Sequence, residues 1–383
     1  MQRSTRRSFL GGASALALET HPLLARALRS GREQLLLVGT QTTQPSSSRG
    51  IYAYRFNSDA GELTQIDLAV ETENPTFLAV GPRGKFVYSV NEVSPGTVSS
   101  FALDKNAMKL SRLSKISTNG GGPTHIAIDH TGRCIFAANY SGGSVASFRA
   151  NSDGQLSEAA SFFQYTADGQ KNERKPHAHR VTVSPDNRFL LVNDLGLDVI
   201  HVYRLDPTTA KLTPHDPPRW QAKVGYGPRA LQFHKNGRVA YCVNELKPVV
   251  NLLGWDPTRG ILTTLQDISL VPEGYSGAAA PSDITFDPKM SFAYVASRLD
   301  DFLATFSVSP KNGTLTMIDK SSCGGRRPRH LAVDPSGRWL LVANQDTDSI
   351  AVFARNKKTG KLANEAKLLH LSRPQCLIFL GKH

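Results

Sequence analysis

Four charged or titratable side chains interrupt apolar stretches of this sequence where the neighbouring residues favour buried β-strands. They are His179, Arg229, Glu245 and Arg298. A histidine or a carboxylate can move protons, and an arginine can hold an anion or polarise a carbonyl oxygen. Because each differs from what most related segments of the chain carry at that place, we interpret the four as catalytic candidates. Surface ion pairing is the alternative interpretation.

A second set of polar residues borders similar apolar stretches and is predicted to bind substrate. It consists of Arg329, His330, His125, Asn139, Asp194 and Gln345. Asparagine recurs at the end of five such stretches, and this repetition favours a structural role, because a short amide readily hydrogen-bonds the following loop. The repeated asparagines are Asn91, Asn139, Asn193, Asn244 and Asn344.

The sequence offers little for a metal or a cofactor. His177 and His179 would project from one side of a strand, but no third ligand stands at a diagnostic spacing. The HExxH, GxSxG, Walker and GxGxxG patterns are absent from the sequence. We therefore predict no metal and no cofactor. The four cysteines are far apart and form no CxxC pair, so we expect mostly free, buried thiols.

The candidate residues fall within a repeat that predicts how they are positioned. Six segments share one layout, in which a proline, or His177 in one segment, is followed 16 residues later by an asparagine or serine. Each segment contains two apolar runs joined by a turn, as in 331–333 and 339–342, which predicts an antiparallel hairpin. A third, alternating run and a more polar fourth run follow. Four antiparallel strands recurring about every fifty residues predict the blades of an all-β propeller.

The seventh repeat is divided between the two ends of the chain. Residues 373–379 supply a first strand, and residues 35–40 and 51–56 supply its missing partners. Pairing the ends closes a seven-bladed β-propeller and removes exposed strand edges, whereas a non-closing solenoid is the structural alternative. The first two strands of a blade are antiparallel, so the start of one and the end of the other lie on the same face. The candidate residues would therefore surround the mouth of a central channel.

Residues 1–27 are predicted to be a twin-arginine export signal, and residues 34–380 to be the propeller domain. Residues 4–10 carry paired arginines before an apolar stretch, and residues 25–27 offer a small-x-small cleavage site. A disordered basic arm is the alternative. The apolar stretch is too short to span a bilayer. We expect the twin-arginine export machinery as a partner, a periplasmic or secreted location, and no membrane span.

The chain is basic, with a formal charge of +13. The charge falls to +10 without residues 1–27, because that segment holds four arginines and one glutamate. The basic residues are scattered and form no compact run with interleaved aromatics, so we expect no nucleic-acid partner. An anionic small substrate explains the excess of positive charge, as does a solvated basic surface.

The stretches 227–229 (Gly-Pro-Arg) and 241–246 (Tyr-Cys-Val-Asn-Glu-Leu) resemble the most diagnostic part of the propeller-type 6-phosphogluconolactonases. The resemblance covers residues 34–380 and extends to the fungal carboxy-muconate lactonizing enzymes. It implies a seven-bladed β-propeller that opens a sugar lactone, with 6-phosphogluconolactone as the expected substrate. It also implies a catalytic set at the channel mouth, which in this sequence is His179, Arg229, Glu245 and Arg298.

For this reaction we expect His179 or Glu245 to act as the base that activates water, and Arg229 to polarise the carbonyl. Arg298 and Arg329 would hold substrate anions, because a guanidinium binds two oxygens at once. The resembling enzymes work in the cytoplasm, where their phosphorylated substrate is made. Because an export signal is predicted here, an unphosphorylated aldonolactone or another cyclic ester is the alternative substrate. A metal-dependent gluconolactonase-like hydrolase and a non-catalytic binding propeller are the rival interpretations.

Overall fold

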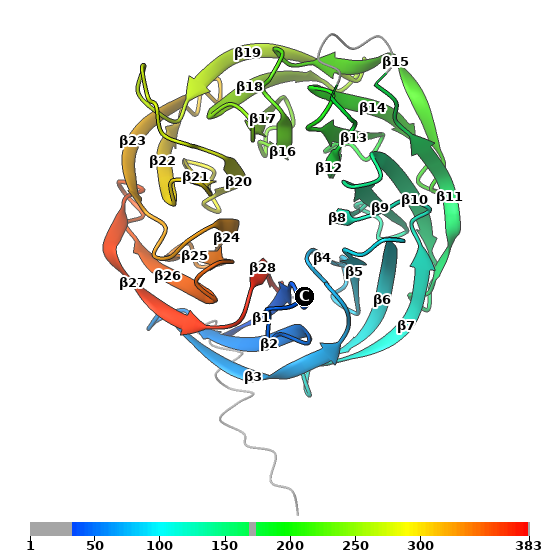
Figure 1. Ribbon diagram of the computed structural model, residues 1–383, viewed down its shortest axis with the longest axis horizontal. Helices are drawn as coiled ribbons and strands as arrows, with labels where there is room; N and C mark the ends of the chain where they lie inside the picture. Colours follow the sequence, from blue (N-terminus) through cyan, green and yellow to red (C-terminus); the bar gives the residue numbers. More distant parts are fainter. Residues whose placement is uncertain (1–32, 168–173, 382–383) are drawn as a thin grey trace, which may run out of the picture.

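The computed structural model describes residues 33–167 and 174–381. These residues form seven four-stranded antiparallel sheets, arranged around a central axis as the blades of a propeller (Figure 1). The predicted all-β, seven-bladed architecture is therefore confirmed. Within the described ranges the structure has no helix long and apolar enough to cross a membrane. The predicted export signal, residues 1–27, lies outside the described residues.

The blades are numbered here along the chain, with each first strand innermost. Blade 1 contains β4 (Leu78–Val80), β5 (Phe86–Asn91), β6 (Thr97–Asp104) and β7 (Lys109–Ser117). Blade 2 contains β8 (Pro123–Ile128), β9 (Cys134–Asn139), β10 (Ser144–Ala150) and β11 (Leu156–Gln164). Blade 3 contains β12 (Ala178–Val183), β13 (Phe189–Asp194), β14 (Val199–Leu205) and β15 (Leu212–Gln221). Blade 4 contains β16 (Pro228–Phe233), β17 (Val239–Asn244), β18 (Val249–Asp256) and β19 (Ile261–Ser269).

The remaining blades follow the same order. Blade 5 contains β20 (Pro281–Phe286), β21 (Phe292–Ser297), β22 (Phe302–Val308) and β23 (Leu315–Ser322). Blade 6 contains β24 (Pro328–Val333), β25 (Trp339–Asn344), β26 (Ser349–Arg355) and β27 (Leu362–His370). Blade 7 contains β28 (Pro374–Phe379), β1 (Glu33–Thr40), β2 (Gly50–Asn57) and β3 (Glu62–Glu71).

The hydrophobic core lies between neighbouring blades rather than at one centre. Between blades 4 and 5, Tyr241 and Val243 of β17 pack with Val295 of β21 and Phe306 of β22. The second strands are continuous apolar runs because sheets cover both of their faces, and every residue of β9, β13 and β17 is buried. Each large apolar side chain buried in such a layer stabilises the fold by about 1.5–3 kcal/mol. All four cysteines are buried and free, as expected.

The two ends of the described chain close the ring. Strand β28 pairs with β1, with Leu377 opposite Val38 and Ile378 opposite Leu37. Blade 7 therefore takes its innermost strand from the C-terminal end and its other three strands from the N-terminal end, as Figure 1 shows. The predicted closure is confirmed.

The innermost strands share an irregularity at their start. In the pairing of β16 with β17, Pro228 lies opposite Asn244 and Ala230 opposite Val243, so Arg229 is an extra residue without a partner. This one-residue β-bulge occurs in six of the seven blades over the described residues. A bulge re-aims a side chain away from the regular alternation of its strand. The bulge residues are Thr124, His179, Arg229, Ser282, Arg329 and Gln375.

Blade 3 departs from the predicted alignment by one residue. Strand β12 pairs with β13 so that Ala178 lies opposite Asp194 and Arg180 opposite Asn193. The prediction that His177 takes the proline position, and Asn193 the asparagine position, is therefore wrong. Ala178 and Asp194 take these positions, because ladder hydrogen bonds set the register and an aspartate can hydrogen-bond a loop as an asparagine does.

Candidate active site

A cavity lies at the end of the propeller axis where the innermost strands begin. The empty space between its walls, counted together with open solvent at the mouth, is about 380 Å³. Five of the six bulge residues face it, and Ser282 is the exception. The lining residues are Thr76, Phe77, Glu92, Thr124, His125, His179, Arg180, Arg229, Asp283, Arg329, His330 and Gln375.

A buried charge network fixes Arg229 in the cavity wall. Its Nε donates to Glu245 Oε2 at 2.8 Å, and its Nη1 donates to the carbonyl oxygen of Ser282. Arg298 Nη2 lies 2.7 Å from the same oxygen of Glu245. Glu245 directly follows β17 and Arg298 directly follows β21, so the ends of two second strands support one bulge residue. The structure thus brings three of the four predicted catalytic residues into direct contact.

Burial and neighbouring charges set the protonation of this network. Burial, with the charge of Arg298, lowers the pKa of Arg229 to about 9 and that of Arg329 to about 10, so both stay charged at neutral pH. Arg329 Nε donates to Gln375 Oε1 at 3.0 Å. Burial raises the pKa of Glu245, but Arg229 and Arg298 outweigh burial and hold it below its usual value. The Glu245 carboxylate is therefore ionised, bound by two arginines and a poor proton acceptor.

His179 is the proton acceptor that the cavity offers. Its ring meets that of Tyr140 edge to face, with centroids 5.5 Å apart, and no described residue hydrogen-bonds either of its ring nitrogens. Burial, followed by the positive charges of Arg229 and Arg329, lowers the pKa of His179 well below its usual value. The imidazole is therefore neutral at neutral pH and has a free lone pair.

The other two histidines of the lining are already engaged. His125 Nδ1 accepts the backbone N–H of Val181 at 3.5 Å, and His330 Nδ1 accepts that of Leu377 at 3.3 Å. In each neutral ring the proton then sits on Nε2, so neither nitrogen can take a proton from water. Burial lowers the pKa of both rings. These two histidines shape the cavity, and His179 remains the candidate base.

Glu92 lines the cavity although our sequence analysis did not select it. It directly follows β5, as Glu245 follows β17, and its backbone N–H donates to Asn74 O at 2.9 Å. Thr76 Oγ1 donates to Glu92 Oε2 at 2.6 Å. Burial raises the pKa of Glu92, against the opposing effects of Thr76 and Arg329. The Asn-Glu pair that ends the second strand in both blades is the sequence signal that could have found it.

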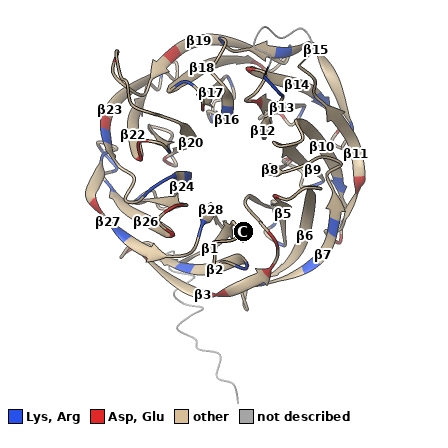
Figure 2. Cartoon of the chain, in the orientation of Figure 1, with Lys and Arg blue, Asp and Glu red and all other residues tan. Residues whose placement is uncertain are grey.

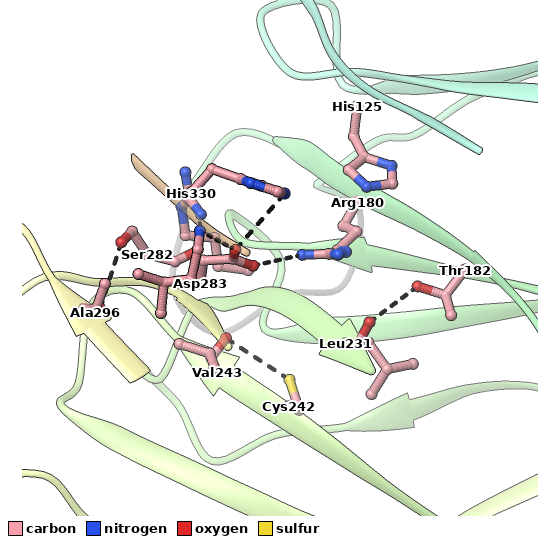
Figure 3. Close-up of polar contacts among 12 residues, drawn as sticks. His125, Arg180, Thr182, Leu231, Cys242, Val243, Ser282, Asp283, Ala296 and His330 are labelled. Carbon is pink, nitrogen blue, oxygen red and sulfur yellow. Dashed lines mark hydrogen bonds and ion pairs between the residues drawn. The ribbon is translucent and has the colours of Figure 1, made fainter. Parts of the chain in front are cut away.

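Arg180 and Asp283 form a floor to the cavity, and our sequence analysis selected neither as a catalytic or substrate-binding residue. Arg180 Nη1 donates to Asp283 Oδ1 at 3.0 Å, which joins β12 of blade 3 to β20 of blade 5 (Figure 3). Asp283 Oδ2 accepts the N–H of Leu331 at 3.1 Å and lies 3.8 Å from His330 Nε2. Arg180, Asp283, His330 and His125 also line a second cavity, which extends along the later residues of the same strands. This layer therefore separates two chambers of the channel.

Two of the predicted substrate-binding residues lie away from the cavity. Asn139 and Asp194 end their second strands in equivalent positions and are fully buried. Asn139 Nδ2 donates to Ser144 Oγ at 2.9 Å, and Asp194 Oδ1 accepts the N–H of His177 at 2.8 Å. Their side chains hold the loops beside them, which is the structural role expected of the repeated asparagines.

Of the four other predicted substrate-binding residues, three line the cavity and one does not. Arg329, His330 and His125 line the cavity. Gln345 is not part of the lining, and its Nε2 donates to Gln41 Oε1 at 3.4 Å.

The ring of His177 packs against Tyr140, so it does not form a metal site together with His179. Its Nδ1 lies 3.0 Å from Tyr140 O, and the two rings stack with centroids 4.5 Å apart. Over residues 33–167 and 174–381, no group of three or more histidine, cysteine, aspartate or glutamate side chains could hold a metal ion.

Positive charge predominates in the cavity. Its lining includes three arginines and two carboxylates among the described residues. Figure 2 shows Lys and Arg spread around the ring, on outer strands as well as on the inner strands β16 and β24. Those inner strands carry Arg229 and Arg329. The arrangement suits a small anionic ligand.

Known proteins resemble the chain over nearly its whole propeller. The family described as Lactonase, 7-bladed beta-propeller, matches residues 35–379. The 6-phosphogluconolactonase of Bacillus subtilis (strain 168) is 30% identical over 74% of this chain and 80% of its own length. That of Formosa agariphila is 32% identical over 74% of this chain and 81% of its own length. The Pseudomonas aeruginosa periplasmic gluconolactonase has a TM-score of 0.86 and 32% identity, covering 91% of this chain and 99% of that one. The chain therefore belongs to the seven-bladed β-propeller lactonase family.

Proposed function

We propose that this protein hydrolyses a sugar lactone of the 6-phosphogluconolactone type. The observation that carries the proposal is one cavity lined by the neutral ring of His179 and by Arg229, which Glu245 and Arg298 support from behind the lining. These groups supply what hydrolysis of a cyclic ester requires, which is a base for water and a fixed positive charge for the carbonyl oxygen. The relatives named 6-phosphogluconolactonase and gluconolactonase support the same reaction.

In the proposed reaction, water attacks the lactone carbonyl carbon while His179 takes a proton from it. Arg229 stabilises the negative charge that develops on the carbonyl oxygen. Of the five N–H donors of a guanidinium, Glu245 and Ser282 use two in the described contacts, and three remain for the substrate. Because Glu245 and the carbonyl oxygen of Ser282 already hold Arg229, the charge needs no reorganisation during the reaction. Collapse of the tetrahedral intermediate breaks the ring C–O bond and gives the hydroxy acid.

Arg329 binds the anionic group of the substrate in this proposal. A guanidinium grips two oxygens of a phosphate or carboxylate at once, and Arg329 lines the cavity together with Arg180 and Arg229. A bound anion also offsets the positive charges that lower the pKa of His179. Substrate binding would therefore strengthen the base just when it is needed.

A panel of phosphorylated and plain sugar lactones, assayed with and without a chelator, tests the proposal. Hydrolysis releases a proton when the new acid ionises, so a pH indicator follows the reaction once spontaneous opening is subtracted. We expect turnover that survives the chelator. Absence of turnover on every lactone would refute the proposal. Loss of turnover in chelator, restored by a divalent metal, would favour the metal-dependent alternative, and tight binding of a protein partner without turnover would favour the binding propeller.

We also infer that the twin-arginine machinery exports the chain to the periplasm. The paired Arg6 and Arg7 support this, as does the periplasmic relative from Pseudomonas aeruginosa. An exported enzyme would meet lactones that lack a phosphate, and for this reason the panel includes the plain aldonolactone. Replacing both arginines by lysine should retain the protein in the cytoplasm, and an unchanged periplasmic fraction would refute the inference.

A further inference from the structure

Breakdown of the tetrahedral intermediate needs a proton donor that the network around Arg229 does not supply. The ring oxygen leaves as an alkoxide of a sugar, which is a poor leaving group unless it is protonated as the bond breaks. Glu245 is ionised and held by two arginines, and His179 has its own task on the water. His179 then carries the proton that it took from water, so a second donor beside the leaving oxygen would be another titratable group of the lining.

The lining contains five carboxyl or imidazole side chains among the described residues. They are Glu92, His125, His179, Asp283 and His330. Asp283 is paired with Arg180, and the Nδ1 atoms of His125 and His330 accept backbone N–H groups. Glu92 differs because the described residues give its carboxyl a hydroxyl partner, Thr76, and no ion pair within 4 Å.

The backbone of Glu92 is held in place by one residue. Asn74 accepts the N–H of Glu92 on its backbone oxygen at 2.9 Å, and its Nδ2 donates to Glu92 O at 3.3 Å. Asn74 itself sits at a φ of 39°, and its Oδ1 accepts the N–H of Thr42 at 2.8 Å and of Thr43 at 3.1 Å. A left-handed conformation in a residue other than glycine persists only where its surroundings fix it. The carboxyl therefore faces the cavity from a rigid support.

We propose that Glu92 is the general acid that protonates the leaving ring oxygen of the lactone. This inference rests on the proposed hydrolysis and adds the residue for its second half. As the ring C–O bond breaks, its electron pair stays on oxygen, and the proton of the Glu92 carboxyl converts that oxygen to a hydroxyl. Glu92 becomes a carboxylate and regains a proton through solvent from His179, which took one from the attacking water. One water is consumed for each lactone opened.

The electrostatic surroundings of Glu92 agree with this role. Burial raises its pKa, while the Thr76 hydroxyl and the charges of Arg329 and Arg229 act in the opposite direction. An anionic substrate bound by Arg329 would weaken that opposition and favour the protonated carboxyl. Glu92 and Glu245 thus have their pKa values moved apart by their environments, which is the pattern of separate acid and electrostatic roles.

The leaving group provides a test that a merely structural role would not pass. Glucono-1,5-lactone expels an alkoxide and needs the acid, whereas dihydrocoumarin is an aryl lactone that expels a phenolate and needs it much less. We expect Glu92→Gln to lower kcat on glucono-1,5-lactone about 100-fold and on dihydrocoumarin by less than about threefold. Glu73→Gln removes an exposed carboxylate from the loop between β3 and β4 and is the matched control, for which both rates should stay unchanged.

The pH profile gives an independent readout. The fall of kcat/KM at high pH should disappear in Glu92→Gln. In Thr76→Val that fall should move to higher pH, because the hydroxyl that lowers the pKa of Glu92 is lost. Equal losses on both lactones, or an unchanged profile in both variants, would overturn the role of Glu92. If the wild-type protein opens no lactone at all, the proposed function itself has failed, so the two failures are distinguishable.

Discussion

Replacing Arg229 by methionine removes the guanidinium and keeps a long apolar stem in the cavity wall. Loss of one donor to a developing oxyanion costs about 10²–10³ in kcat, or about 3–4 kcal/mol of transition-state stabilisation. The cost to the fold is smaller, because Glu245 keeps Arg298 at 2.7 Å and only the carbonyl of Ser282 loses its donor. We therefore expect the free energy of unfolding to fall by about 1–3 kcal/mol.

The two effects are measured separately. Proton release on a sugar lactone gives kcat and KM, and urea unfolding gives the free energy of unfolding. Arg83→Met is the matched control, since it removes one positive charge from the exposed turn between β4 and β5. If Arg229→Met stays folded and retains kcat within about threefold of the wild-type value, the role of Arg229 at the carbonyl oxygen is refuted. An equal loss in Arg83→Met would trace the effect to overall charge instead.

Because only the neutral ring of His179 can accept a proton, kcat/KM should fall as the pH drops through its pKa, which lies well below the ordinary value. Arg329→Met removes a charge that lowers this pKa, so the fall should move to higher pH, and a profile that stays in place would contradict the assignment of the base. Asp283→Asn leaves Arg180 without its carboxylate and should lower the free energy of unfolding by about 1–3 kcal/mol. A urea midpoint equal to that of the wild type would show that this ion pair does not hold the floor. Burial raises the pKa of Cys134, Cys323 and Cys376 to about 12, so a thiol reagent should label the protein only after denaturant is added, and rapid labelling of the native protein would contradict their burial.

The blade count and ring closure were predictable because each blade repeats the same four-stranded backbone arrangement. A proline opens the innermost strand and an asparagine ends the next, and ladder geometry keeps their spacing at 16 residues. Departures from that repeat then predicted the catalytic candidates. Arg229, Glu245 and Arg298 stood out because their charge replaced the more usual residue, and the structure joins them in one network.

Other parts of the site depend on contacts that the repeat does not encode. Arg180 and Asp283 are 103 residues apart and meet because their strands face each other across the axis. The β-bulge has no residue signature of its own, so the sequence could not say which of two adjacent side chains turns into the cavity. Asn139 and Asp194 were assigned to the substrate because they end second strands beside the starts of the first strands, whereas their side chains bind the neighbouring loops.

The pairing of β28 with β1 determines when the ring of blades can close during synthesis of the chain. Ribosomes add about 5–20 residues per second, so the 383 residues take on the order of 20–80 s to synthesise. From its own synthesis onward β1 has an unpaired edge until its partner at 374–379 has been translated. A prematurely terminated polypeptide would keep this edge open and could recruit the corresponding strand of another copy. The arrangement makes synthesis through residue 379 the condition for a closed ring.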